Sequence, residues 1–251
     1  MSAKGLITAI GELSVLSVQS VRELFRSPFE GRLLVEQFSR GGVDSWSITV
    51  LTAVFTGMVL AAQFAIGLQP FGASMYTGKL VALGIVRELG PVLTALLVGG
   101  RVGAGFTAEL GTMAVTEQID ALRCLGANPV RKLVMPRVVA MTVMMPLLTL
   151  LADIVGCSGG ALISIVEIGV TPSLAVNQMI ETVDVIDLFH GLIKATFFGY
   201  IVAIIACWVG MSARGGAESV GKSTTNTVVY ASVSILMADF ALTKFLMTVM
   251  G

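Results

Sequence analysis

Residues 46–69 read WSITVLTAVFTGMVLAAQFAIGLQ, a run that contains no Asp, Glu, Lys or Arg. A transmembrane α-helix needs about 20 predominantly apolar residues to cross a bilayer. The whole chain of 251 residues is similar, with 55% hydrophobic and 13% charged residues and a mean hydropathy of +0.89. A soluble domain carries about 25% charged residues. We therefore expect an all-α integral membrane protein, because in lipid the backbone must satisfy its own hydrogen bonds.

Further apolar runs bring the expected number of transmembrane helices to about five. They cover about 79–101, from Leu133 or Met135 to about Gly156, 191–212 and about 227–249. The third run continues as far as residue 169, which is too long for one span and short for two. We expect one span that is broken at Gly159-Gly160 and followed by an external helical segment.

The positions of Lys and Arg indicate the orientation, because cytoplasmic segments are enriched in basic residues. Residues 1–45 and residues 101–137 each hold five Lys or Arg. Residues 157–190 hold no Lys or Arg, and their acidic residues are Glu167, Glu181, Asp184 and Asp187. This pattern predicts a cytoplasmic N-terminus, and five spans then place the C-terminus on the opposite, periplasmic side.

The N-terminal 45 residues form an expected amphipathic or interfacial segment, and residues 46–251 the transmembrane domain. A secretory signal is not expected, because the segment carries Glu12 and no clear cleavage site. Apolar residues spread over one broad side of a helix within 5–25. Such a helix could lie in the membrane interface or pack on the protein's own cytoplasmic surface.

Composition also argues against several kinds of site. The net charge of zero gives no reason to expect a nucleic-acid partner. The three cysteines, at 124, 157 and 207, are too scattered for a disulfide framework or a zinc site. The single histidine, His190, has no ligand cluster around it. We expect neither a metal nor a cofactor.

Residues 85–101, IVRELGPVLTALLVGGR, place two charges and a proline inside an apolar span. Pro91 has no N–H, so the carbonyl of Arg87 loses its usual donor and the helix should kink there. Arg87 and Glu88 are adjacent and point about 100° apart, so they cannot pair well with each other. Each of them therefore needs another partner or water.

Two more ionisable residues, Lys194 and Asp239, lie in other spans. Glu88 and Asp239 fall roughly 14–18 Å from a span end, near mid-depth, and Lys194 lies closer to the outer face. Ionisable groups at this depth usually face a bundle interior or a wet cavity. We interpret the group as a substrate path; the alternative is a buried ion cluster that only fixes helix register. The members of this group are Arg87, Glu88, Pro91, Lys194 and Asp239.

A short cytoplasmic helix is expected over about 116–126, between the second and third spans. Thr116 could cap it, and acidic residues at 117 and 120 suit its positive N-terminal end. Gly126 suits the position after its last turn. A short helix with one apolar side can dock in a groove of a cytoplasmic partner. The residues expected to make this contact are Glu117, Asp120, Leu122 and Leu125, with Ile119 completing the apolar stripe.

The stretch RELGPVLTALLVGGRVGAGFTAELGTMAVTEQIDALRCLGANPVRKLVMPR, residues 87–137, resembles the MlaE/YrbE permease family. The similarity continues through GGAESVGKSTTNTVV at 215–229 and DF at 239–240. The resemblance implies the inner-membrane permease of an ABC-type lipid transporter that works with MCE proteins. It implies a homodimer, two cytoplasmic ATPases docked on the 116–126 helix, a periplasmic MCE partner and, in some members, a STAS-domain protein. The family's intramembrane charges fall on Arg87, Glu88, Lys194 and Asp239.

Residues 216–223, GAESVGKS, satisfy the Walker A pattern G-x-x-x-x-G-K-[ST] in full. That pattern binds nucleotide only where a strand precedes the loop within an α/β domain. Here a membrane span precedes it and another follows. We interpret the match as a tight Gly-rich cytoplasmic turn, so the chain itself is not expected to be an enzyme.

Two other classes of function are alternatives to an ABC permease. An ion- or proton-coupled secondary transporter could use the intramembrane charges, but the five spans show no clear inverted repeat. An intramembrane enzyme would need a nucleophile or metal set, and the sequence shows neither. The phospholipid permease is the favoured hypothesis.

Overall fold

The computed structural model describes residues 3–24 and 31–250. All regular secondary structure in that part of the chain is helical, with short turns and loops between the helices. The sequence prediction of five membrane-spanning helices is confirmed by length and composition. The five apolar stretches are Leu33–Phe71, Ser74–Val115, Val130–Val166, Val185–Met211 and Ala217–Val249.

The α-helices are α1 (Ala3–Leu24), α2 (Gly31–Gly41), α3 (Trp46–Leu68), α4 (Thr77–Gly84), α5 (Gly90–Val115), α6 (Gln118–Cys124), α7 (Met135–Val166), α8 (Pro172–Thr182), α9 (Val185–Met211) and α10 (Ala217–Met250). Short 3₁₀ turns cover η1 (Val43–Ser45), η2 (Gln69–Phe71) and η3 (Ser74–Tyr76). Two π-helical turns, η4 (Ile85–Leu89) and η5 (Val130–Val134), each precede a long helix.

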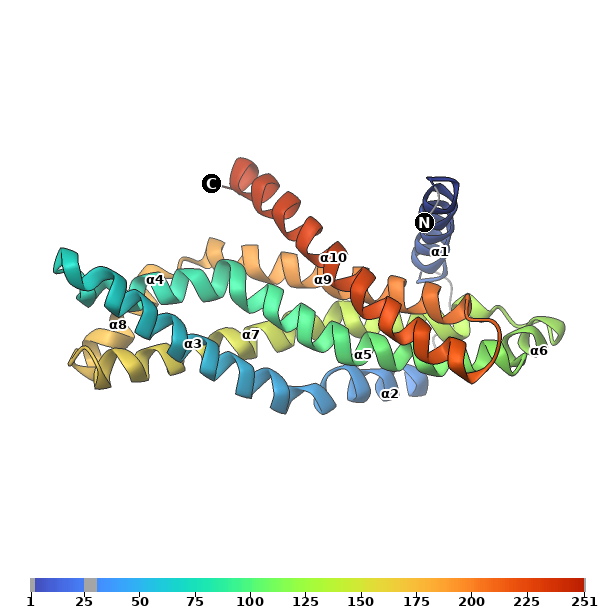
Figure 1. Ribbon diagram of the computed structural model, residues 1–251, viewed down its shortest axis with the longest axis horizontal. Helices are drawn as coiled ribbons and strands as arrows, with labels where there is room; N and C mark the ends of the chain where they lie inside the picture. Colours follow the sequence, from blue (N-terminus) through green and yellow to red (C-terminus); the bar gives the residue numbers. More distant parts are fainter. Residues whose placement is uncertain (1–2, 25–30, 251) are drawn as a thin grey trace.

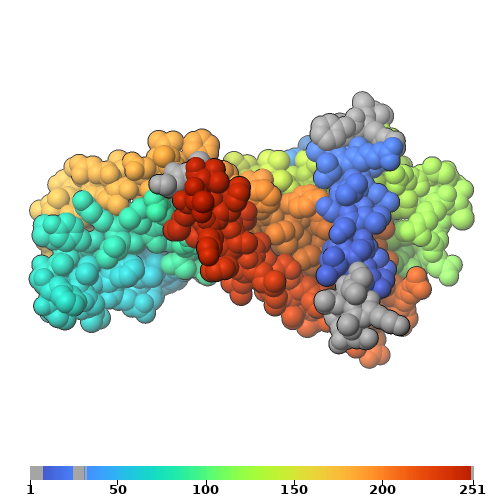
Figure 2. Space-filling view, turned by 90° about the horizontal axis from the view of Figure 1, so that it is seen from above, coloured from blue at the N-terminus to red at the C-terminus, as the bar shows by residue number. Residues whose placement is uncertain are grey.

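The long helices α3, α5, α7 and α9 run along one axis and form an elongated bundle (Figure 1). Helix α6 lies at one end of the bundle and α8 at the other. The main packing pairs are α3 with α7, α5 with α9, and α10 with α5. The second half of α10 leaves the bundle and projects away from it (Figures 1 and 2).

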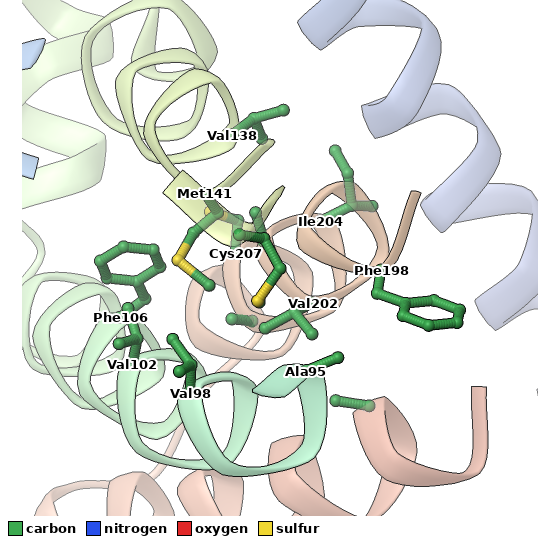
Figure 3. Close-up of a cluster of buried hydrophobic side chains, with 14 of the residues drawn as sticks. Ala95, Val98, Val102, Phe106, Val138, Met141, Phe198, Val202, Ile204 and Cys207 are labelled. Atoms are coloured by element: carbon green, nitrogen blue, oxygen red, sulfur yellow. The ribbon is translucent and has the colours of Figure 1, made fainter. Parts of the chain in front are cut away.

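The core lies between α5, α7 and α9, where apolar side chains from the three helices meet (Figure 3). Phe198, Val98 and Met141 are completely buried there. Helices in lipid gain close packing from small residues, which let backbones approach. At Gly57, for example, an added Cβ would overlap the carbonyl oxygen of Gly156, so α3 and α7 touch backbone to backbone.

The expected break at Gly159-Gly160 is wrong, because α7 continues as one helix through both glycines to Val166. The two glycines serve packing instead. A Cβ at Gly159 would lie 2.5 Å from the carbonyl oxygen of Val54, and one at Gly160 would lie 2.6 Å from the side chain of Val81. A helical segment does follow this span, as α8. The second span is also longer than predicted, since its helix extends to Val115.

Helix α1 crosses the bundle near the α6 end (Figures 1 and 2). Its inner side packs on α9, where Ser17 hydrogen-bonds Tyr200 and Glu12 accepts a hydrogen bond from Trp208 Nε1 at 2.9 Å. Its outer side leaves Val15, Val18 and other apolar residues exposed. A helix packed on the protein's own surface and a helix that lies in the membrane interface, the two alternatives from the sequence, are thus compatible. Residues 1–2 and 25–30 of the N-terminal segment lie outside the described residues.

Candidate functional site

The sequence predicts a kink at Pro91. Just before this residue the structure has the π turn η4, which joins α4 to α5. The N–H of Gly90 donates to the carbonyl of Ile85, five residues back. Because Pro91 lacks an N–H, it can serve neither the carbonyl of Val86 nor that of Arg87. The turn therefore presents backbone acceptors to its neighbours and carries the adjacent charges of Arg87 and Glu88.

Lys194 of α9 is the centre of the site and is 1% exposed. Its Nζ donates to Glu88 Oε2 at 2.7 Å and to the carbonyl of Arg87 at 3.1 Å. It also forms an ion pair with Asp239 Oδ1 of α10 at 3.2 Å, although the two are not aligned as a hydrogen bond. One ammonium group therefore joins η4, α9 and α10, and it takes up a carbonyl that Pro91 leaves without a donor.

Arg87 pairs with Asp187 in the first turn of α9, and its Nε donates to Asp187 Oδ1 at 2.6 Å. Asp187 is 1% exposed, and its other oxygen accepts the backbone N–H of Asp184 at 3.1 Å. From the sequence alone, Asp187 belongs to an acidic segment expected to be external, and nothing there predicts this role. Its spacing of seven residues from Lys194 is the signal that could have found it, because two helical turns bring both onto one face.

The five side chains comprise two cations, Arg87 and Lys194, and three carboxylates. The side chains of Arg87 and Glu88 remain 40% exposed, whereas Lys194 and Asp187 are nearly closed off. The Oγ1 of Thr243, one turn beyond Asp239, lies 3.5 Å from both oxygens of Glu88. Arg87 and Glu88 are therefore partly exposed, Glu88 beside α10, and both are held by buried partners.

The short helix predicted at 116–126 is α6, and Gly126 follows it with a φ of 76°, as expected. The expected cap is wrong. Thr116 Oγ1 instead donates to the carbonyl of Thr112 at 2.8 Å, within the last turn of α5. Glu117 occupies the cap position with a φ of 59°, a left-handed conformation that lets the chain turn sharply between α5 and α6.

The predicted apolar stripe on α6 is divided between two environments. Ile119 is 4% exposed and fixes α6 to the bundle, while Leu125 is 82% exposed and Leu122 is partly buried. Asp120 pairs with Arg123 at 2.7 Å on the exposed side. Ile119 therefore serves the internal packing of α6, and Leu122 and Leu125 remain as the apolar residues of the predicted contact.

The Walker A match at 216–223 does not have the structure of a phosphate-binding loop. Gly215 and Gly216 form the turn, with φ of 100° and 95°, and α10 begins at the next residue. Lys222 is exposed within the second turn of that helix. No β-strand occurs in residues 3–24 or 31–250, so nothing there supplies the strand that such a loop follows. The expected turn is therefore shorter than the motif.

A second charge cluster, near the α6 end, was not found from the sequence. Arg137 of α7 is 4% exposed and binds Glu109 Oε2 of α5 at 2.7 Å. Arg40 of α2 reaches the other oxygen of Glu109 at 3.2 Å. The guanidinium of Arg137 also lies 5.6 Å from the ring centre of Phe106. The cluster ties three helices together, and its residues are too far apart in sequence for spacing to reveal it.

Comparison with known proteins gives the family. Residues 34–245 match the family model described as Permease MlaE. A probable ABC transporter permease protein of Rickettsia conorii is 38% identical over 94% of this chain and 91% of its own length. One of Synechocystis is 40% identical over 88% of this chain and 85% of its own length.

A plant relative is the chloroplastic protein trigalactosyldiacylglycerol 1 of Arabidopsis thaliana. It is 37% identical over 92% of this chain and 66% of its own length. An ABC transporter permease of this kind implies separate ATPase partner subunits. The chain belongs to the MlaE permease family and is a multi-pass ABC transporter permease.

Proposed function

We propose that this permease moves phospholipid, or a related lipid, between the inner membrane and a periplasmic MCE partner. The observation that carries the proposal is the charged group at Lys194, where partners from η4, α9 and α10 meet within a span. The plant relative, whose name is that of a lipid, supports the substrate class. The family's ATP-driven transport favours this proposal over an ion-coupled carrier.

The half-exposed charges of Arg87 and Glu88 would meet the polar headgroup, and the apolar surfaces beside them would accommodate the acyl chains. The second half of α10 offers such a surface, with Met237 and Phe240 exposed by 71% and 72%. A transporter needs a polar level inside an otherwise apolar path. The site provides it, because its buried partners hold the two outward charges in place.

A homodimer would bury the projecting half of α10 against the second copy. A monomer that exposes Met237, Phe240 and Phe245 on a helix leaving the bundle has apolar surface available for a partner. In the dimer, the two charged groups would form a collar around a shared central cavity. A STAS-domain protein would be a further partner in those systems that possess one.

The ATPase would dock at the α6 end, on the cytoplasmic side, with the N-terminus also cytoplasmic and the C-terminus periplasmic. The exposed Leu125 and partly buried Leu122 would provide the apolar contact, and Glu117 and Asp120 would orient α6. Basic residues such as Arg123 and Arg214 lie at this end, as the positive-inside rule requires.

The test is to measure lipid transport and membrane abundance together for Glu88→Gln and Asp239→Asn, each alone and with Lys194→Met. A substrate path predicts that transport falls in the single variants while abundance is maintained. If a charge-balanced double variant regains full transport, the group has only a structural role and the headgroup proposal fails. Transport by the unaltered complex reconstituted in vesicles with its ATPase is the reference.

A further inference from the structure

Asp153 of α7 is an acid inside a membrane span that the charged group around Lys194 does not use. It is 4% exposed, and its Oδ1 has no hydrogen-bond partner among the described residues. A buried polar group without a partner costs free energy, and an ionised one costs far more. Its retention in mid-span therefore calls for a specific role.

The carboxyl group lies directly against the π turn. A Cβ built on Gly90 would overlap Asp153 Oδ1, so the carboxyl occupies the space that the missing side chain leaves. The same point is 2.9 Å from the carbonyl oxygen of Ile85. The carboxyl of Asp153 and the carbonyl of Ile85, the first residue of the turn that carries Arg87 and Glu88, therefore both border the place of the missing Gly90 side chain.

Helix α9 holds the opposite side of this turn. Lys194 donates to the carbonyl of Arg87, and a Cβ on Gly191 would overlap the carbonyl oxygen of Val86. The carbonyls of Val86 and Arg87 are therefore each approached by a group from α9, and the carboxyl of Asp153 borders the turn on the α7 side. On the α7 side the approaching group is an oxygen, which can hold a carbonyl only if it carries a proton.

We infer that Asp153 is a neutral carboxyl that donates a hydrogen bond to the π turn and positions Arg87 and Glu88 toward α9. This inference concerns a positioning residue and rests on the proposed function only for its effect on transport. No described cation pairs with Asp153, and the nearest titratable side chain on its own helix, Cys157, is one turn away. A carboxylate facing a carbonyl in this apolar surrounding would be repelled, whereas the acid is attracted.

The packing around Gly90 leaves the turn free to shift if this bond is lost. A cavity of about 20 Å³ borders Gly90 between α3, α5 and α7, with Thr52, Thr56 and Thr94 among its lining residues. That volume holds about one water molecule. The cavity beside the turn is therefore small, and the turn is also held by the Gly90 N–H and by Lys194.

The test compares Asp153→Asn, which is isosteric and keeps a donor, with Asp153→Leu, which is similar in size and has none. The first readout is hydrogen–deuterium exchange of the peptide that covers residues 84–92, in the complex in nanodiscs. We expect exchange roughly tenfold faster in the Leu variant, the change for one lost buried hydrogen bond, and nearly unchanged exchange in the Asn variant. Lipid transport, the second readout, should fall in the Leu variant and be retained in the Asn variant.

Equal exchange in the Leu variant and the unaltered protein would overturn the positioning role. Faster exchange in the Asn variant as well would overturn the neutral-donor role, since it would show that the carboxyl itself is needed. If the unaltered complex transports no lipid but the exchange pattern is as expected, the proposed function fails and this inference stands. Gly67→Ala, at a glycine of α3 with open space around it, is the control for general loosening.

Discussion

Replacement of Lys194 by Met should destabilise the protein more than any other single neutralisation in the charged group. The substitution leaves two acceptors without their donor, Glu88 at 2.7 Å and the carbonyl of Arg87 at 3.1 Å, and removes the ion-pair partner of Asp239 at 3.2 Å. Breaking a buried ion pair costs about 3–5 kcal/mol. Because the side chain of Glu88 is 40% exposed and water can reach it, we expect a loss near the lower limit, about 3 kcal/mol.

Neutralising the partner carboxylate instead, by Glu88→Gln, should lower the free energy of unfolding by only about 1 kcal/mol. The amide oxygen can still accept from Lys194, and Asp239 still balances the ammonium. The free energy of unfolding is measured by SDS titration in mixed micelles. Lys79→Met is the matched control, because among the described residues Lys79 has only a ring contact with Tyr76, at 5.9 Å. If Lys194→Met is no less stable than this control, the ammonium does not hold η4, α9 and α10 together and the site geometry is wrong.

Three other predictions follow from the packing and from the α6 end. Gly57→Ala should destabilise the α3–α7 contact by about 1–3 kcal/mol, because the methyl group would overlap the carbonyl of Gly156. Gly67→Ala, on the same helix, meets no atom within 4 Å and should leave the stability unchanged. Thermal midpoints of the two purified variants check this, and equal midpoints would contradict it. Leu125→Asp should release the ATPase during co-purification without loss of membrane insertion. The control Gln118→Asp, which adds the same charge at the start of α6, should keep the ATPase bound. Full retention of the ATPase by the Leu125 variant would count against docking there. Lys222→Ala should leave ATP hydrolysis by the complex within roughly twofold of normal, as for an exposed surface residue, and saturable ATP binding by the isolated chain would overturn that expectation.

The membrane architecture could be predicted because it depends on local properties of the chain. Runs such as 46–69 are long and apolar enough on their own, and α3 covers Trp46–Leu68. The need of Arg87 and Glu88 for separate partners could also be predicted, since adjacent helical residues point apart. The carbonyl that Pro91 leaves free could be named in advance, although its partner Lys194, 107 residues further on, could not.

The features that sequence reasoning missed depend on contacts between helices. Gly159 and Gly160 suggest a break when only local propensity is considered, yet they lie where α7 touches α3 and the helix continues. Asp187 belongs to an acidic stretch near a helix end, and only the folded protein shows that it is buried beneath Arg87. Asp153 is a single acid in a long apolar run, and its closeness to Gly90 arises from packing between α7 and α5.

The proline, the glycine and the charges in RELGP can now be understood as parts of one turn. Pro91 removes a donor, Gly90 removes a side chain, and the resulting π turn gives the carbonyl of Arg87 to α9 and leaves room for the carboxyl of Asp153 from α7. A purely structural connection between these helices would not require charge, because apolar residues of similar volume often replace a buried ion pair without loss of stability. Here the buried charges hold two others, on Arg87 and Glu88, that remain half open beside an apolar helix. Lys194 and Asp187 are buried and support the site, whereas Arg87 and Glu88 are open to contact. This arrangement favours a path for a molecule with both a polar and an apolar part.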